Sequence, residues 1–429
     1  MGCRVFSNRS VKDKTDTSPE NPSAIKTYPL RNEQDLDILI KEIGEAKIVL
    51  LGESTHGTRE YYTWRTAITK RLIAENGFDF IAVEADWTDS YKINQLIRGP
   101  AQDSAAVLKT LKQYDRWPSS MWGNYEMASL IQWLNSYNQD KIPEEKSGFY
   151  GLDLYSFWEW TRQNIVTSDT GVLNSVKQVK DLFSVFNDDA LRYADTVRKA
   201  NINYSSITER LWGKIQKLTG GKQPVDEAGF LMQQQAFLTL NGEYYFREMV
   251  NNRVKAINLR DGYMAETIKR LLVFHGNGSK AIIWVHNGHA GDAHYSNMAD
   301  GGYTSTGEIL RKDFGRDKIF CVGFGTYKGF VTAGYIWNGP LQEIRLLPAK
   351  DGSWESILHQ LGAENKIILS KDIRNNKTLN KWIEFRSVGA AFSGAAVYGR
   401  SIMSERFDSF IFIDSTTALH PLERTNKNN

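Results

Sequence analysis

The segment KIVLLGESTHGTREYY, residues 47–62, runs from a short apolar stretch into a turn that carries a carboxylate and an imidazole. Residues 48–51 have the length and composition of a buried strand, and Glu53 and His56 follow them between two glycines. A helix-periodic stretch comes next, and then a second apolar strand, FDFIAVEAD, which begins at Phe78. This alternation predicts an α/β fold with a mainly parallel central sheet flanked by helices.

The whole chain divides into four parts. A polar start that is rich in Pro and Ser predicts a disordered segment over residues 1–30, and strands and helices alternate over 31–156. Strand patterns nearly vanish between 157 and 274, where long helix-periodic stretches predict a large helical insertion or cap. Strand patterns return in 275–429, which we expect to complete the α/β body.

Composition and charge limit the classes of function. The 429 residues carry a net charge of +3, from 53 basic and 50 acidic residues, without a basic block, so we expect no nucleic-acid partner. No apolar run approaches the ~20 residues that span a bilayer, which predicts no transmembrane segment. The sequence does not indicate the oligomeric state.

The two cysteines bear on the location of the protein. Cys3 and Cys321 exclude a disulfide scaffold, and both are expected to be free thiols. The N-terminal sequence lacks the apolar core of a signal peptide, which favours a cytoplasmic location. The alternative is a lipid-anchored or periplasmic protein, if a signal peptide was removed before Cys3.

Polar side chains follow the predicted core strands at their carboxyl ends. Glu84 ends the second strand, and His286 and His289 end a later one, AIIWVHNGH. Because ligands of open parallel sheets bind outside the carboxyl ends of the strands, we expect these groups to meet Glu53 and His56 in one crevice.

The residue types in this crevice indicate proton-transfer chemistry. A histidine can take and return a proton near neutral pH, and a neighbouring carboxylate fixes its tautomer. Arg65, on the helix that follows His56, is a candidate cation for a developing oxyanion. No GxSxG motif is present, and Cys321 lies in an apolar strand, so the expected nucleophile is water.

Each residue also has a structural interpretation. A single histidine after a strand is commonly a turn or core residue, and His286 and His289 flank Asn-Gly, itself a turn signal. Aspartate after a strand commonly begins a turn, so Asp86 and Asp153 are expected to be structural. The functional interpretation gains its weight from the combination, because four strands that end in acid or imidazole are hard to arrange by chance.

Two alternatives use the same side chains. Histidine and glutamate at strand ends are ligands for Zn²⁺ or Fe²⁺, although no HExxH or CxxC motif supports a metal site. A ligand-binding protein without turnover, for example one that holds haem, is the non-catalytic alternative.

Aromatic residues crowd the stretches after the second and third strands. We expect them either to pack in the core or to form the apolar wall of a wide cleft, with the helical stretch closing over it as a lid. The candidates are Trp117, Met121, Trp122, Tyr125, Phe157 and Trp158.

Several blocks resemble those of the erythromycin esterase family, in its broader, less characterised branch. They are LGESTHGTREYYTWR, IAVEAD, YGLDLYS, NLRDGYMAET and WVHNGHAGD, and the resemblance extends from about Leu36 to about Asp414. The spaced set GExxHG, R, E and HNxH is specific as a combination. One departure is the sequence GESTHGT, where the drug-hydrolysing esterases read closer to GEGxHF.

The resemblance implies an α/β body with a helical part and a macrolide lactone ester opened by hydrolysis, without a required metal or other cofactor. It thereby implies inactivation of the antibiotic. In the family the motif histidine is taken as the base that activates water. Carried over, the catalytic set is His56, Glu53, Glu84, Arg65, His286 and His289. The partner implied is a small ester or macrolide, and the departure leaves the macrolide less secure than the hydrolysis.

Overall fold

The computed structural model describes residues 25–114, 121–160, 165–186, 189–200, 202–221, 226–336, 339–389, 392 and 398–422. Its strands are β1 (Tyr28–Pro29), β2 (Ile48–Leu51), β3 (Phe80–Asp86), β4 (Gly148–Asp153), β5 (Ala281–Trp284), β6 (Ile319–Ala333), β7 (Gln342–Leu346), β8 (Lys366–Leu369), β9 (Ile383–Arg386), β10 (Tyr398–Ser401) and β11 (Ser409–Thr416).

The α-helices are α1 (Asp37–Ile43), α2 (Arg59–Asn76), α3 (Trp87–Arg98), α4 (Ser104–Leu111), α5 (Tyr125–Tyr137), α6 (Thr170–Ser184), α7 (Ala190–Ala200), α8 (Ser205–Leu218), α9 (Glu227–Met249), α10 (Arg253–Phe274), α11 (Asn287–Ala290), α12 (Thr306–Phe314), α13 (Trp354–Gln360), α14 (Ser370–Ile373) and α15 (Met403–Arg406).

The central sheet confirms the predicted α/β fold. Its strand order is β1-β8-β11-β6-β2-β5-β3-β4, and the six strands from β11 to β4 run parallel to their neighbours. Strands β1 and β8 add an antiparallel edge, and β7 pairs antiparallel with the far end of β6. Strands β2, β3 and β5 lie side by side, with both Leu51 and Val83 opposite Trp284, so their carboxyl ends meet at one place.

Alternate residues of each core strand enter opposite hydrophobic cores. Ile48 and Leu50 join one core, which also holds apolar residues of α9 and α10, while Val49 and Leu51 join the other, which holds residues of α1, α2 and α5. Because all four residues of β2 are buried, the strand reads as a continuous apolar run, as expected for a parallel sheet covered on both faces.

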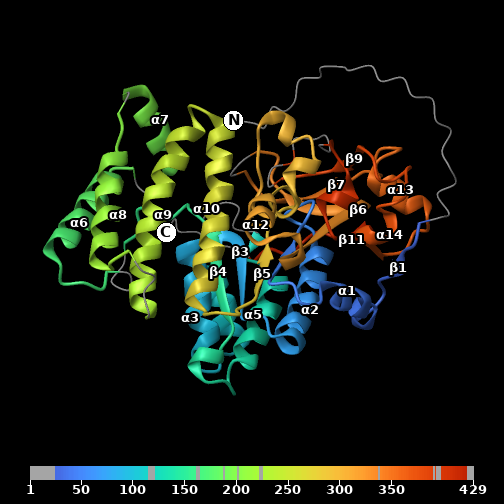
Figure 1. Cartoon of the computed structure of the whole chain (residues 1–429), viewed down its shortest axis with the longest axis horizontal. Helices are drawn as coiled ribbons and strands as arrows, with labels where there is room; N and C mark the ends of the chain where they lie inside the picture. The colour runs from blue at the N-terminus through green and yellow to red at the C-terminus, as the bar shows by residue number, and fades with distance from the viewer. Residues whose placement is uncertain are drawn as a thin grey trace.

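The stretch expected to be a helical insertion contains the helices α6 to α10. Within the described residues between β4 and β5, no strand interrupts them. Figure 1 shows α6, α7 and α8 gathered at one side of the molecule, with α9 and α10 between them and the sheet. Helix α10 packs on α9, α12 and β4, and it is therefore the helix of this stretch that reaches the ends of the core strands. A function of the stretch as a cap stays a prediction.

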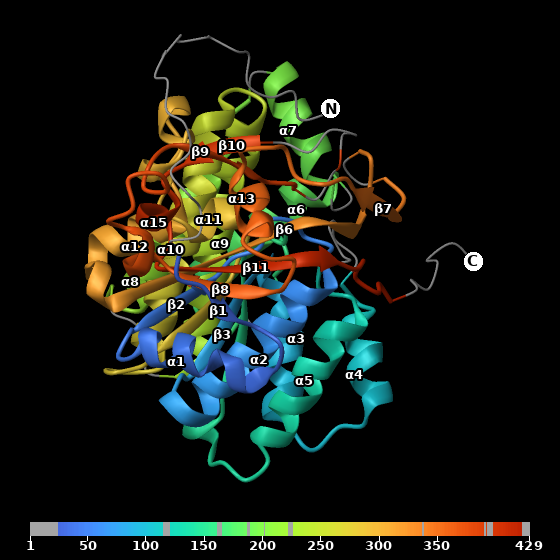
Figure 2. The same ribbon diagram turned by 90° about the vertical axis from the view of Figure 1, so that its right-hand side faces the viewer.

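The C-terminal part adds strands that the apolar pattern does not reveal. Strands β9 and β10 form a separate two-stranded ribbon, which Figure 2 shows on the side of the molecule opposite to α1 to α5. Such short strands, with half-exposed residues such as Tyr398 and Gly399, lack the continuous apolar run that marks β2 or β3.

The turn after β2 is held by close backbone contacts at Gly57. Its carbonyl oxygen accepts hydrogen bonds from the N–H groups of Thr332 and Leu419, both at 2.9 Å. A Cβ atom on Gly57 would lie 1.8 Å from the Thr332 carbonyl oxygen, so only glycine fits against β6 here.

This contact predicts that Gly57→Ala lowers the free energy of unfolding by about 1–3 kcal/mol, because the methyl group forces the two chain segments apart. The measurement is urea unfolding. Gly213→Ala, inside α8, is the control, because no heavy atom lies within 4 Å of the added Cβ. That substitution should leave stability unchanged or raise it by up to about 1 kcal/mol. Equal effects of the two variants would contradict the prediction.

Candidate active site

The turn after β2 brings together Glu53, His56 and Arg65. One carboxylate oxygen of Glu53 is 2.8 Å from Nδ1 of His56, and the other accepts a hydrogen bond of 2.6 Å from Nη2 of Arg65. Glu53 and Arg65 are fully buried, whereas the side chain of His56 keeps 13% of its surface exposed. The carboxylate therefore links a buried cation to a partly exposed imidazole.

Arg65 is placed behind Glu53 rather than in the crevice. Its guanidinium group contacts the rings of Tyr62 and Trp284, with its central carbon 4.6 and 4.5 Å from their centroids. Since the side chain is 0% exposed, Arg65 acts on the site through Glu53. This position does not favour direct contact of Arg65 with an oxyanion.

Glu84 lies at the centre of a second cluster. Its carboxylate accepts hydrogen bonds from the backbone N–H of His286 at 2.7 Å and from Nη2 of Arg260 at 2.9 Å. Burial by itself raises the pKa of Glu84, but His289, Arg260 and His56 outweigh it and hold this pKa well below its usual range. Glu84 is therefore a carboxylate at all ordinary pH values.

Arg260, on α10, joins this cluster to β4. Its Nε and Nη2 atoms donate hydrogen bonds of 2.9 and 2.5 Å to the two oxygens of Asp153. The same guanidinium group lies 3.0 Å from Nε2 of His289 and is 12% exposed. Arg260 is thus a partly exposed cation that joins Glu84, Asp153 and His289.

His286 is a neutral, directional group. It is the N-cap residue of the short helix α11, and its Nδ1 accepts a hydrogen bond of 3.1 Å from the Gly288 N–H, which places its proton on Nε2. Burial, and after it the neighbouring His56, lower the pKa of His286 to about 3. The ring centroids of His286 and His56 are 5.0 Å apart.

The Nε2 atom of His286 is buried and has no hydrogen bond of ordinary geometry within the described residues, although the Ser54 backbone is near enough to act on its pKa. The group is therefore an N–H donor without a good acceptor, next to His56.

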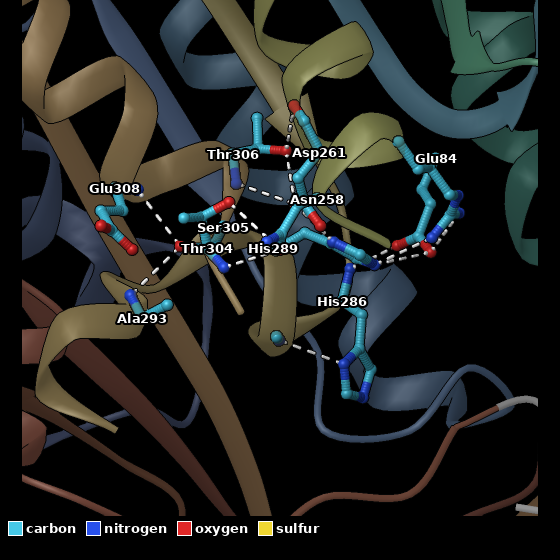
Figure 3. Close-up of polar contacts among 12 residues, drawn as sticks. Glu84, Asn258, Asp261, His286, His289, Ala293, Thr304, Ser305, Thr306 and Glu308 are labelled. Carbon is cyan, nitrogen blue, oxygen red and sulfur yellow. Dashed lines mark hydrogen bonds and ion pairs between the residues drawn. The ribbon is translucent and has the colours of Figure 1, made fainter. Parts of the chain in front are cut away.

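His289 points away from His286, toward α10. Its Nδ1 is 2.7 Å from a carboxylate oxygen of Asp261, and its Nε2 is 3.5 Å from Glu84 (Figure 3). Burial opposes the charged imidazole, but Asp261 and Glu84 outweigh it and raise the pKa of His289. The two histidines of one motif are thus shifted in opposite directions.

The asparagine between them fixes the motif to the sheet. The Asn287 backbone N–H donates to the Glu53 carbonyl at 2.8 Å, and its side-chain amide exchanges hydrogen bonds with the backbone of Phe324 on β6. Asn287 therefore holds the turn after β5 against the turn after β2.

The structure brings together all six residues expected at the site, in two contiguous clusters. Sequence reasoning did not assign Arg260 and Asp261, although the block NLRDGYMAET contains them. An Arg-Asp pair inside a long helix has no local feature that separates it from a solvated pair. Asp153 was expected to be structural, but it binds Arg260 in the site. Asp86 was interpreted correctly, because its carboxylate caps α3.

The aromatic residues expected at a cleft wall are mostly core residues. Met121, Phe157 and Trp158 belong to the two hydrophobic cores, and Tyr125 is 55% exposed. Trp122 is buried, and its indole N–H donates to the Glu84 carbonyl at 3.1 Å, so it supports β3 from behind. Trp117 lies outside the described residues, as does Cys3.

The clusters are built of ion pairs rather than of open ligand sets. Among the residues that the structure describes, no group of three or more His, Cys, Asp or Glu side chains has a metal-binding arrangement. Guanidinium groups occupy one carboxylate oxygen or both in Glu53, Glu84 and Asp153. In the same described residues, no helix is both long and apolar enough to cross a membrane.

The family profile of the erythromycin esterases matches residues 73–416. The chain belongs to the erythromycin esterase family. It is 21% identical to erythromycin esterase type II of Escherichia coli over 91% of this chain and 94% of that protein. Membership supports a hydrolase of the esterase type.

Solved structures share the fold. A succinoglycan biosynthesis protein is 20% identical, with a TM-score of 0.73 over 93% of this chain and 97% of its own. A Bacillus cereus protein is 19% identical, with a TM-score of 0.77 over 94% of this chain and 100% of its own. A mutant of the erythromycin esterase EreC in its open conformation is 14% identical, with a TM-score of 0.64 over 91% of this chain and 97% of its own.

The buried pair of Glu53 and Arg65 yields a stability prediction. Arg65→Met should lower the free energy of unfolding by about 3–5 kcal/mol, because it leaves the Glu53 carboxylate buried without its cation. Arg71→Met is the control on the same helix, since Arg71 pairs with the exposed acids Asp37 and Glu75 and should lose at most about 1 kcal/mol. Urea unfolding at pH 7 compares the two. Similar losses would mean that the pair does not stabilise the fold.

Proposed function

We propose that this protein hydrolyses a carboxylic ester or lactone with a water molecule that His56 deprotonates. One observation carries the proposal: Nδ1 of His56 is held by Glu53, which leaves Nε2 directed away from that pair on a partly exposed ring. An imidazole whose Nδ1–H donates to a carboxylate presents a lone pair on Nε2, which is the arrangement of a general base.

The groups around His56 suit the rest of the reaction. Water attacks the ester carbonyl carbon and gives its proton to Nε2 of His56. The guanidinium group of Arg260, which is partly exposed, is a donor for the oxyanion that forms on the carbonyl oxygen. The C–O bond then breaks, and His289 in its protonated form gives a proton to the leaving oxygen. The products are a carboxylate and a hydroxyl group, which stay in one molecule when the substrate is a lactone.

Arg65 has a separate role in this scheme. Because it is buried and bonded to Glu53, it fixes the position of the Glu53 carboxylate rather than touching substrate. Arg260 is partly exposed, as a cation that binds an oxyanion must be. Glu84 accepts hydrogen bonds from Arg260 and from the backbone N–H of His286, so it orients the guanidinium group of Arg260.

The substrate that we propose is a macrolide lactone, with inactivation of the antibiotic as the consequence. Support comes from family membership and from the E. coli relative, whose name is erythromycin esterase type II. The proposed location is cytoplasmic. The metal-dependent alternative is disfavoured by the guanidinium groups that occupy the carboxylates, because a metal ion would have to displace them. Haem binding has no specific support among the contacts described.

Incubation with a panel of macrolides and simpler esters tests the proposal. We expect at least one macrolide to gain the mass of one water molecule. We also expect the rate to persist after prolonged chelation, with no stoichiometric metal on elemental analysis. Activity that is lost on chelation and restored by a metal would establish the metal-dependent alternative. No turnover of any ester, together with a Soret band in the preparation, would favour haem binding.

Replacement of the base gives the sharper test. His56→Ala should lower kcat by about 10²–10⁴, because general-base catalysis is lost. His359→Ala is the matched control: His359 also binds a carboxylate, that of Asp414 at 2.5 Å, but on α13 and outside both clusters. The kcat of His359→Ala should stay within about twofold of that of the parent enzyme. A folded His56→Ala enzyme within tenfold of the parent would refute the assignment.

A further inference from the structure

We propose that Asp261 is a positioning residue, which holds the neutral ring of His289 in the tautomer with its proton on Nδ1 and thereby makes Nε2 the atom that exchanges protons with substrate. The first turn of α12 holds Asp261 in place. The proposal rests on the proposed function where it gives His289 a proton to deliver, and its test separates the two.

The contacts of Asp261 define its role. One oxygen, Oδ1, lies 2.7 Å from Nδ1 of His289 and accepts hydrogen bonds from the backbone N–H of Thr306 at 2.8 Å and from its hydroxyl group at 2.9 Å. Asp261 is 0% exposed. A carboxylate oxygen that already accepts from a backbone N–H and a hydroxyl group is an acceptor, so it accepts the Nδ1–H of His289.

The opposite nitrogen of His289 gives independent evidence for the same tautomer. Nε2 lies 3.0 Å from Nη1 of Arg260, and a guanidinium group can only donate hydrogen bonds. Nε2 therefore accepts in this state and carries no proton. The two contacts, at opposite sides of the ring, require the same distribution of protons. His286 has the other tautomer, because its Nδ1 accepts from Gly288.

Helix α12 and the segment after His289 are joined tightly enough to keep this geometry. A Cβ atom on Gly307 would lie 2.0 Å from the Ala290 carbonyl oxygen, so the first turn of α12 packs directly on the end of α11. The N-cap residue Ser305 donates to the Gly291 carbonyl at 2.6 Å and accepts from the Ala293 N–H at 3.1 Å. Figure 3 shows this chain of contacts running from Ala293 through Ser305 and Thr306 to Asp261 and His289.

The contacts of Asp261 and His289 resemble those of Glu53 and His56. In both, a carboxylate binds Nδ1 of an imidazole, and a positive group braces the carboxylate. For His56 these are Glu53 and Arg65; for His289 they are Asp261 and the N-terminal turn of α12, where aligned N–H groups act as a partial positive charge. Nε2 of His56 is directed away from its carboxylate, and Nε2 of His289 faces Arg260.

The charged groups that face His289 come from two neighbouring elements. Asp261 and Arg260 face it from α10, and Glu84 faces it from β3, with His286 next in its own turn. Asp261 and Glu84 favour the imidazolium form, whereas Arg260 opposes it. Loss of the Asp261 charge should therefore lower the pKa of His289.

Nitrogen NMR of the parent protein tests the tautomer directly, without any assay. In ¹⁵N-histidine-labelled protein, neutral His289 should carry its proton on Nδ1 and neutral His286 on Nε2. The spectra of His289→Gln and His286→Gln assign the two signals by their absence. A neutral His289 with its proton on Nε2 would overturn the proposal, even if no Asp261 variant folds.

The variant Asp261→Asn tests how Asp261 affects the pKa of His289 and the rate of catalysis. It should lower the pKa of His289 in the NMR titration and lower kcat by about 10²-fold or more, with KM changed by less than about threefold. The alkaline limb of the kcat profile should move to lower pH, because His289 loses its proton earlier. Glu308→Gln is the matched control: it removes a carboxylate from the same first turn of α12 without touching His289. It should leave the tautomer, the titration and kcat unchanged.

The outcomes separate this proposal from the proposed function. If Asp261→Asn shifts His289 as stated while the parent protein hydrolyses no ester, the positioning role holds and the proposed function fails. If the parent is active and Asp261→Asn leaves both the His289 titration and kcat unaltered, the positioning role is wrong and the proposed function holds. Equal effects of Asp261→Asn and Glu308→Gln would mean that Asp261 acts only as a negative charge near the start of α12, and the positioning role would be wrong.

Discussion

Four buried carboxylates and two guanidinium groups are the constraint on which the rest of the site depends. Glu53, Glu84 and Asp153 bind Arg65 or Arg260, and Asp261 binds His289, so the acids outnumber the fixed cations by two. Buried charges are tolerated only when they are paired and hydrogen-bonded. His289, whose pKa is raised, and the N-terminal turn of α12 supply further positive charge. The site therefore holds a labile proton at His289.

The sheet makes this grouping possible. Strands β2, β3, β4 and β5 each deliver one or two polar residues at or just past their carboxyl ends, and the parallel register puts those ends side by side. Helix α10 then adds both Arg260 and Asp261 from one turn, which ties the helical stretch to the sheet by charge as well as by packing. A shift of α10 relative to the sheet would separate Arg260 from Asp153 and Asp261 from His289 together. The position of α10 therefore determines whether the contacts of Arg260 and Asp261 form.

The sequence predicted the parts of this arrangement that depend on local pattern. The apolar runs located β2, β3 and β5, and the polar residues after them located Glu53, Glu84 and His286, because burial on both faces and the end of a strand leave marks within a few residues. Arg260 and Asp261 left no such mark, since their role is defined by partners on β4 and after β5. Trp122 shows the opposite limit. Its position after a strand was compatible with a cleft wall, but its indole supports the back of β3. Periodicity cannot tell on which side of a backbone a large ring lies.

The opposite shifts of His286 and His289 follow from the same constraint. Both histidines belong to one short turn, yet one faces the interior without a carboxylate on its ring, and the other is bonded to Asp261. Burial and the neighbouring His56 and His289 make the first a neutral N–H donor, with a pKa of about 3. For the second, Asp261 and Glu84 outweigh burial and raise the pKa, which makes it a proton carrier. A metal ion that bound both rings would require two neutral imidazoles with converging lone pairs. Here Nδ1 of His286 is occupied by Gly288 and Nε2 of His289 by Arg260, so the motif is arranged for two different proton states.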